Sequence, residues 1–194
     1  MKKSDGKLKY NIAVFISGKG SNLNSIIKYS KQKKVRYNVK IVISNKNKVG
    51  GLLIAKKYNI ENYFIDFTKS KKLGNKVINI LKKNNINLVC LAGFMKVLPS
   101  YFIKSYNGKI INIHPSLLPK YKGLNTHQRA IDNGEKYSGC TLHFVNSKLD
   151  SGKIIMQRKV KILKSDNSER LAKRVLKQEH ILYPIGLKKL ISNL

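Results

Sequence analysis

Residues 10–23 read Tyr-Asn-Ile-Ala-Val-Phe-Ile-Ser-Gly-Lys-Gly-Ser-Asn-Leu, an apolar run followed by a glycine turn and the start of a helical pattern. Tyr10–Ile16 is rich in the β-branched and aromatic residues that favour strands. After the turn, Leu23, Ile26 and Ile27 recur on one helical face. A strand that leads directly into a helix is the repeating unit of parallel α/β sheets. This stretch therefore predicts the α/β class.

The same alternation of strand and helix continues along the first half of the chain. Further strands are expected at Val39–Ser44, Tyr63–Phe67, Leu88–Ala92 and Lys109–Ile113, with helices at Leu52–Tyr58, Lys72–Asn84 and, briefly, after Pro99. Leu88–Ala92 is continuously apolar, which is typical of a strand buried on both faces. The order predicts a doubly wound, mostly parallel sheet with right-handed crossovers.

The second half of the chain has a different pattern. The expected elements are a helix at Thr126–Asn133 closed by Gly134, strands at Cys140–Val145 and Ile154–Ile162, and a last helix capped at Asp166 or Asn167. The loop between the two late strands suits an antiparallel pair. Pro184 is expected to bend or end the last helix. The sequence thus predicts an antiparallel C-terminal portion of the sheet.

Length and composition limit the protein class. A chain of 194 residues is expected to form a single domain, 1–194, with a phosphate-binding half at about 9–100 and a second half at about 101–194. No stretch approaches the roughly 18 apolar residues of a membrane span, and the start has no apolar signal segment. Cys90 and Cys140 lie in separate apolar runs, which favours reduced, buried thiols. We expect a cytoplasmic protein without membrane partners.

The formal net charge of +31 raises the question of nucleic-acid binding. Of the 40 basic residues, 35 are Lys and five are Arg, whereas base and phosphate recognition favours Arg. The lysines are also spread over the whole length. We therefore interpret the charge mainly as the Lys- and Asn-rich composition typical of an AT-rich coding sequence, and expect no nucleic-acid partner. A positive surface would still attract an anionic substrate.

Two loops at strand ends carry candidate chemistry. In the glycine turn, Ser17–Leu23, backbone N–H groups at a helix start form an anion site, although a plain capped turn explains the residues equally well.

In the run Asn112-Ile113-His114-Pro115-Ser116-Leu117-Leu118-Pro119-Lys120-Tyr121, a strand end presents an amide and an imidazole one residue apart. Two prolines keep the following segment out of a helix. A donor and a proton carrier on a stiff strand end suit acyl transfer.

That run and its continuation, Lys122-Gly123-Leu124-Asn125-Thr126-His127, resemble the signature of folate-dependent formyltransferases. The resemblance covers about residues 10–183 and points to the members that act in purine synthesis. It implies transfer of a formyl group from 10-formyltetrahydrofolate, a co-substrate, to the amine of glycinamide ribonucleotide. It also implies no metal, small-molecule substrates only, and a monomer or homodimer.

The resemblance assigns site residues by position. The catalytic set it implies is Asn112, His114 and Asp150; the ribonucleotide site is Gly20, Ser21, Asn22 and Glu179; the folate site is Phe94, Met95, Lys96, Val97, Leu98, Asn112, His143 and one lysine near the third helix, for which we take Lys71. Related proteins usually carry Arg at the position of Lys96 and often Gly at that of Ser151. His127 and His180 are interpreted as structural residues.

Three other functions compete with this interpretation. Methionyl-tRNA formyltransferase shares the Asn/His and Ser-Leu-Leu-Pro pattern but usually reads His-Ala-Ser and adds a tRNA-binding domain. Formyltetrahydrofolate deformylase normally carries an N-terminal regulatory domain. A basic RNA-binding module is suggested by charge alone. Pro115 and the Lys122-Gly123 pair favour the purine enzyme.

Overall fold

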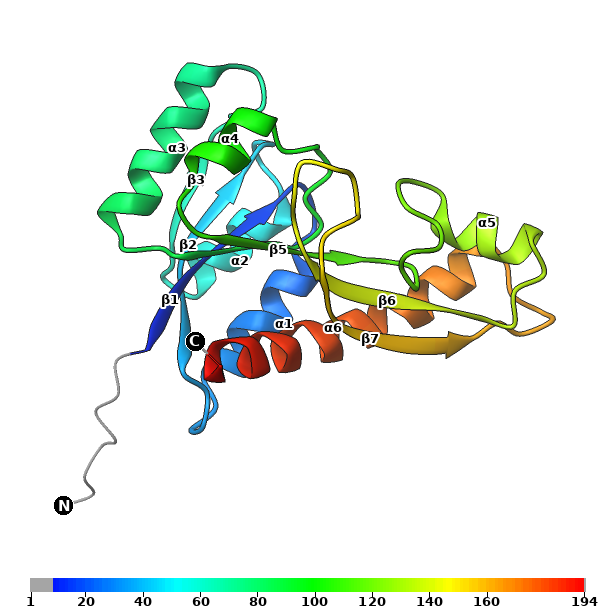
Figure 1. The fold of residues 1–194 in the computed structure, drawn as a ribbon. Coiled ribbons are helices and arrows are strands. Elements are labelled where there is room, and N and C mark those ends of the chain that lie inside the picture. The colour runs from blue at the N-terminus through cyan, green and yellow to red at the C-terminus, as the bar shows by residue number, and fades with distance from the viewer. Residues whose placement is uncertain (1–8, 194) are drawn as a thin grey trace.

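A seven-stranded sheet runs through the computed structural model, which describes residues 9–193 (Figure 1). The strands are β1 (Tyr10–Ile16), β2 (Tyr37–Ser44), β3 (Glu61–Phe64), β4 (Leu88–Leu91), β5 (Lys109–His114), β6 (Tyr137–Phe144) and β7 (Ile154–Lys161). The helices are α1 (Ser21–Ser30), α2 (Gly50–Lys57), α3 (Lys71–Lys83), α4 (Ser100–Ser105), α5 (Thr126–Asp132) and α6 (Ser168–Ser192).

The strand order is β3-β2-β1-β4-β5-β6-β7. β1 to β5 pair in parallel, and β6 and β7 are antiparallel. The predicted α/β class and antiparallel C-terminal portion are confirmed. The parallel arrangement follows from the helix that separates each early strand from the next, since a parallel pair needs a long crossover.

Helices cover both faces of the sheet. One apolar cluster joins the sheet to α1, α2 and α6, and a second joins its opposite face to α3 and α4. Aromatic rings fill the second cluster, where Phe15, Phe67, Phe94 and Phe102 contact one another. Continuous burial of β4 on both faces explains its unbroken apolar sequence.

The structure corrects one expected strand and excludes one of the two alternatives for Pro184. The third strand is Glu61–Phe64, not Tyr63–Phe67, because only the first part pairs with β2 before the chain turns its buried Phe67 into the aromatic cluster. The last helix also does not end at Pro184 but continues to Ser192. Tyr183 and Leu187, on either side of the proline, are fully buried, so packing offsets the missing backbone hydrogen bond.

The topology brings two loops together. β1 and β4 are neighbours in the sheet, but the chain goes from β1 to β2 on one side and from β4 to β5 on the other. The loops that follow β1 and β4 therefore lie side by side. Open α/β sheets bind ligands at this kind of switch point. None of the helices within residues 9–193 is long and apolar enough to span a bilayer.

Candidate active site

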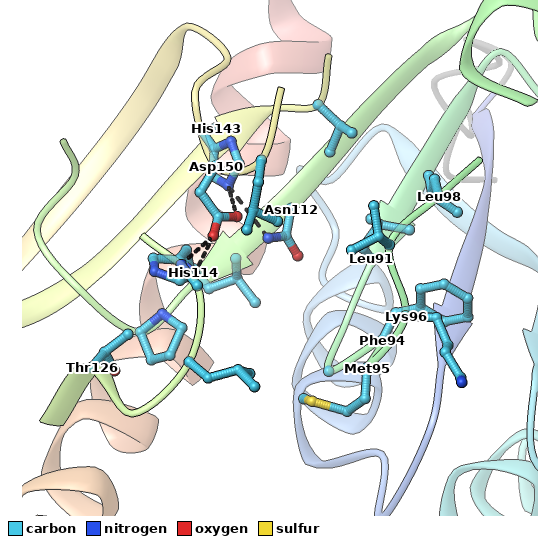
Figure 2. Close-up of a pocket in the computed structure, with 18 of the residues that line it drawn as sticks. Leu91, Phe94, Met95, Lys96, Leu98, Asn112, His114, Thr126, His143 and Asp150 are labelled. Carbon is cyan, nitrogen blue, oxygen red and sulfur yellow. Dashed lines mark hydrogen bonds and ion pairs between the residues drawn. The ribbon is translucent and has the colours of Figure 1, made fainter. Parts of the chain in front are cut away.

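A cavity of about 820 Å³ opens at the carboxyl ends of β4 and β5. One wall is apolar and comes from the loop after β4, which we call the cofactor loop, residues 93–98. The opposite wall is polar. Figure 2 shows the two walls facing each other across the gap, with the polar side formed by Asn112, His114, His143 and Asp150.

His114 ends β5 and is held between two acceptors. Its Nε2 lies 2.8 Å from the Tyr121 carbonyl oxygen, and its Nδ1 lies 3.4 Å from Asp150 Oδ2. The His114 and Asp150 side chains are 7% and 8% exposed. An imidazole can face two acceptors with N–H groups only when both nitrogens are protonated. Each ring nitrogen of His114 therefore has an oxygen atom within reach.

His143, on β6, is in the opposite situation. Its Nδ1 lies 2.8 Å from the Phe144 carbonyl oxygen, so Nδ1–H donates, and its Nε2 accepts from Asn112 Nδ2 at 3.3 Å. Burial holds the pKa of His143 below its ordinary value, although Asp150, 3.7 Å from Nε2, opposes this. A neutral His143 thus fixes the orientation of the Asn112 amide, whose nitrogen faces the His143 ring.

Asp150 is held by its own backbone and by the opposing loop. Its φ of 44° is left-handed, a region that Asp tolerates better than most residues. The Gly123 N–H donates to Asp150 Oδ2 at 2.9 Å. This contact fixes the carboxylate beside His114. Gly123 itself has a φ of 77°, which explains the glycine in the 122–123 pair.

The cofactor loop divides its side chains between core and cavity. Phe94 turns inward and stacks on Phe67 at 5.6 Å between ring centroids. Met95 and Val97 are 67% and 71% exposed. A loop anchored by one buried ring with apolar neighbours left open can receive a flat apolar ligand.

The glycine turn at residues 17–22 forms a second group beside this cavity. Gly20 has a φ of 78°, and a Cβ there would lie 2.5 Å from Gly51 Cα. Asn22 Nδ2 donates to Glu179 Oε2 at 2.7 Å, whereas Asn22 Oδ1 has no partner among residues 9–193. Burial raises the pKa of Glu179 from 4.5 to about 7, and the Asn22 hydrogen bond opposes the rise.

Comparison with known proteins identifies the family. A family model described as formyl transferase matches residues 10–187. The chain belongs to the formyl transferase family. Phosphoribosylglycinamide formyltransferase of Escherichia coli (strain K12) is 40% identical over 178 residues, with 90% of this chain and 84% of the relative covered. The Haemophilus influenzae enzyme of the same name is 42% identical over 180 residues, covering 91% and 85%.

Solved structures of family members have the same fold. A crystal structure of phosphoribosylglycinamide formyltransferase from Brucella melitensis has a TM-score of 0.88 at 40% identity, covering 94% of this chain and 95% of that one. The human trifunctional purine biosynthetic protein adenosine-3 is 39% identical over 189 residues, which are 96% of this chain. The chain spans only 19% of that relative's length. The family predicted from residues 112–127 is confirmed.

The structure brings most of the predicted site residues together. Nine of them line the cavity: Phe94, Met95, Lys96, Val97, Leu98, Asn112, His114, His143 and Asp150. Gly20, Ser21, Asn22 and Glu179 gather at the start of α1, through the Asn22–Glu179 contact. Lys71 begins α3 and is not among the cavity-lining residues. Cys90 and Cys140 are free and buried, as expected.

Three contributors were not found from sequence. The Tyr121 carbonyl, the Gly123 N–H and the Ser17 hydroxyl each hold a site residue or loop in place. Backbone groups carry no side-chain signal, although the glycine of the 122–123 pair marks its turn. His127 also lines the cavity, and burial together with His114 holds its pKa low. Within residues 9–193, no group of three or more His, Cys, Asp or Glu side chains could hold a metal ion.

Proposed function

We propose that this chain transfers the formyl group of 10-formyltetrahydrofolate to the amine of glycinamide ribonucleotide. The products are N-formylglycinamide ribonucleotide and tetrahydrofolate, and the reaction is a step of purine biosynthesis. The observation that carries the proposal is the polar wall, in which Asn112 and a His114 held between two acceptors face one cavity.

The reaction requires one bond to form and one to break at the formyl carbon. The neutral amine bonds to that carbon, negative charge develops on the formyl oxygen, and the bond to the folate nitrogen breaks. The Asn112 side-chain amide and the His114 imidazolium stabilise the developing charge. The proton lost by the amine replaces the formyl group on the folate nitrogen. We assign this relay to water, because each ring nitrogen of His114 already faces an acceptor oxygen.

The two substrates enter from different elements. The first N–H groups of α1, at Ser21 and Asn22, receive the ribonucleotide phosphate, since an α-helix of 10 residues leaves these groups without acceptors. The Asn22 side chain is occupied by Glu179, so its contribution to the phosphate comes from the backbone. Glu179 accepts a hydrogen bond from the glycyl amine. The cofactor loop and the cavity of about 820 Å³ receive the flat heterocycle of the folate.

The remaining features of the proposal follow from this chemistry. We assign the chain a cytoplasmic role with small-molecule substrates only, as a monomer or homodimer. Lys71, at the start of α3, is assigned to the acidic tail of the folate. The formyl group of the donor is already activated, so no metal is assigned to the reaction.

A two-substrate assay tests the proposal. Purified protein is supplied with 10-formyltetrahydrofolate and either glycinamide ribonucleotide or methionyl-tRNA, and formylated product is quantified by mass spectrometry. We expect turnover with the ribonucleotide and none with tRNA. Formylation of tRNA, or release of formate without either acceptor, would replace the proposal with one of the related activities.

A further inference from the structure

Ser17 is a buried hydroxyl that joins three loops at the switch point. It follows β1 and is 4% exposed. Its Oγ donates to Asn45 Oδ1 at 2.6 Å and accepts from the Met95 N–H at 2.7 Å. Its backbone N–H also donates to the Gly93 carbonyl at 3.1 Å. The first residue of the glycine turn therefore holds the cofactor loop at two points.

The direction of these hydrogen bonds is set by Asn45. Asn45 follows β2, is 4% exposed, and presents an oxygen to the hydroxyl. Because the Ser17 hydroxyl donates its proton to Asn45, its oxygen can act only as an acceptor for the Met95 N–H. Ser17 itself is not among the residues that line the cavity. Any effect of the Ser17 side chain on a ligand in the cavity must therefore act through the cofactor loop.

The loop needs this support at Met95. Phe94 is anchored by its packing on Phe67, whereas the next side chain, Met95, is 67% exposed and faces the cavity. The Ser17 hydrogen bond fixes the backbone at the point where the chain leaves the aromatic cluster. The exposed apolar side chains that follow take their positions from that point.

We propose that Ser17, oriented by Asn45, is a positioning residue that sets the affinity for the folate by fixing the cofactor loop from within the glycine turn. The inference rests on the proposed function, because it takes the folate as the ligand of this loop. Ser17→Ala keeps the backbone hydrogen bond to Gly93 and the bond from the Gly51 N–H to the Gly18 carbonyl. The phosphate-binding backbone therefore keeps its shape, and the loss falls on the folate.

Steady-state kinetics of Ser17→Ala test the assignment. Leaving the Met95 N–H without its acceptor is expected to raise KM for 10-formyltetrahydrofolate about tenfold. The Kd of tetrahydrofolate, measured by calorimetry, rises by the same factor. kcat and KM for the ribonucleotide stay within about twofold, because the interaction is made equally in ground and transition states. Ser30→Ala is the control, since it removes a buried hydroxyl that bonds only within α1 at 2.8 Å.

Hydrogen exchange gives a readout independent of turnover. The Met95 amide is expected to exchange slowly in the wild type and in Ser30→Ala, and fast in Ser17→Ala. Asn45→Ala leaves the hydroxyl in place but unoriented, so it should raise the folate KM by about threefold alone and add nothing in the Ser17→Ala background. This variant also tests the assignment if Ser17→Ala does not fold.

The outcomes separate the inference from the function on which it rests. A wild type that does not formylate the ribonucleotide removes the proposed function. An active wild type whose Ser17→Ala variant keeps its folate KM and slow Met95 exchange overturns the role of Ser17. A fall in kcat with an unchanged folate KM overturns it equally, as do independent effects of Ser17→Ala and Asn45→Ala.

Discussion

His114 and His143 lie on adjacent strands and contact the same carboxylate, yet their other partners differ. His114 faces a carbonyl and a carboxylate, so each of its nitrogens has an acceptor nearby. His143 faces one carbonyl and one amide, so one nitrogen donates and the other accepts. These partners support the separate roles that we propose, in which His114 stabilises charge at the formyl group and His143 orients Asn112.

Asn112→Ala tests the oxyanion contact. The alanine keeps the backbone pairing of β5 but removes the side-chain amide, so kcat should fall by about 10²–10³, the usual cost of one oxyanion donor. KM for both substrates should change little, because the contact strengthens only in the transition state. Initial rates measured over a range of concentrations of each substrate give kcat and both KM values. A variant that keeps near wild-type kcat would remove Asn112 from the catalytic set.

Asp150→Asn tests the charge on His114. The amide keeps the size of the side chain, and its oxygen can still accept from the Gly123 N–H. The negative charge 3.4 Å from His114 Nδ1 is lost, so the imidazolium is less stable and its population at pH 7 falls. Nitrogen NMR of the His114 ring reports that population, and kcat should fall with it by roughly tenfold or more. An unchanged ring spectrum together with unchanged kcat would make Asp150 a structural loop residue.

At the scale of elements, the strand-turn-helix at residues 10–23 shows what sequence can and cannot predict. The apolar run and the helical stripe specify β1 and α1, since both depend on local periodicity. The Ser17 contact to Met95 spans 78 positions along the chain, and the Asn22 contact to Glu179 spans 157. No local pattern encodes such pairs. They arise because β1 and β4 are neighbours and α6 packs on α1.

Gly20→Ala tests whether the conformation of the glycine turn is needed to bind the ribonucleotide phosphate. Gly20 is left-handed, and its Cβ would meet the Gly51 backbone, so the alanine must displace the first turn of α1. We expect KM for the ribonucleotide to rise at least tenfold while KM for the folate changes less. Gly18→Ala is the matched control, because a Cβ there meets nothing within 4 Å. Equal effects of the two substitutions on the ribonucleotide would contradict a phosphate site at this turn.

Glu179→Gln tests how α6 meets α1 as pH changes. The folded-state pKa of Glu179 is about 7 against an ordinary 4.5, so the folded protein binds the proton more tightly than the unfolded chain. This contribution to stability is present below pH 4.5 and is lost as pH rises to 7, on the order of 3 kcal/mol. Glu179→Gln should therefore gain stability relative to the wild type over that window, measured by urea unfolding. Glu169→Gln, an exposed site on the same helix, is the control, and a difference from wild type that stays constant with pH would contradict the assignment.

At the scale of the whole molecule, the family and the sheet could be predicted from the sequence. The backbone groups that hold the site residues in place could not. Residues 112–127 carry the family signature, and in the proposed reaction their side chains perform the chemistry. The Tyr121 carbonyl and the Gly123 N–H serve the same site through the backbone, which any residue of suitable conformation supplies. Lys71 is assigned only from its place near the third helix, with no motif to fix it, and it stays a prediction because it begins α3 outside the cavity lining.

The net charge of +31 gives a prediction for the molecule as a whole. With 40 basic and nine acidic residues, positive charge cannot be balanced locally, and both proposed substrates are anions. Such a field accelerates association at low ionic strength and is screened as the Debye length shortens from about 30 Å at 0.01 M to about 8 Å at 0.15 M salt. We expect kcat/KM for the ribonucleotide to fall roughly three- to tenfold over that range, while kcat stays constant because screening leaves the buried His114–Asp150 pair unaffected. Salts with different anions should give the same dependence of kcat/KM on ionic strength. This result separates screening from competition between the salt anion and the substrate phosphate at the glycine turn. A kcat/KM that does not respond to ionic strength would mean that the charge has no part in substrate capture.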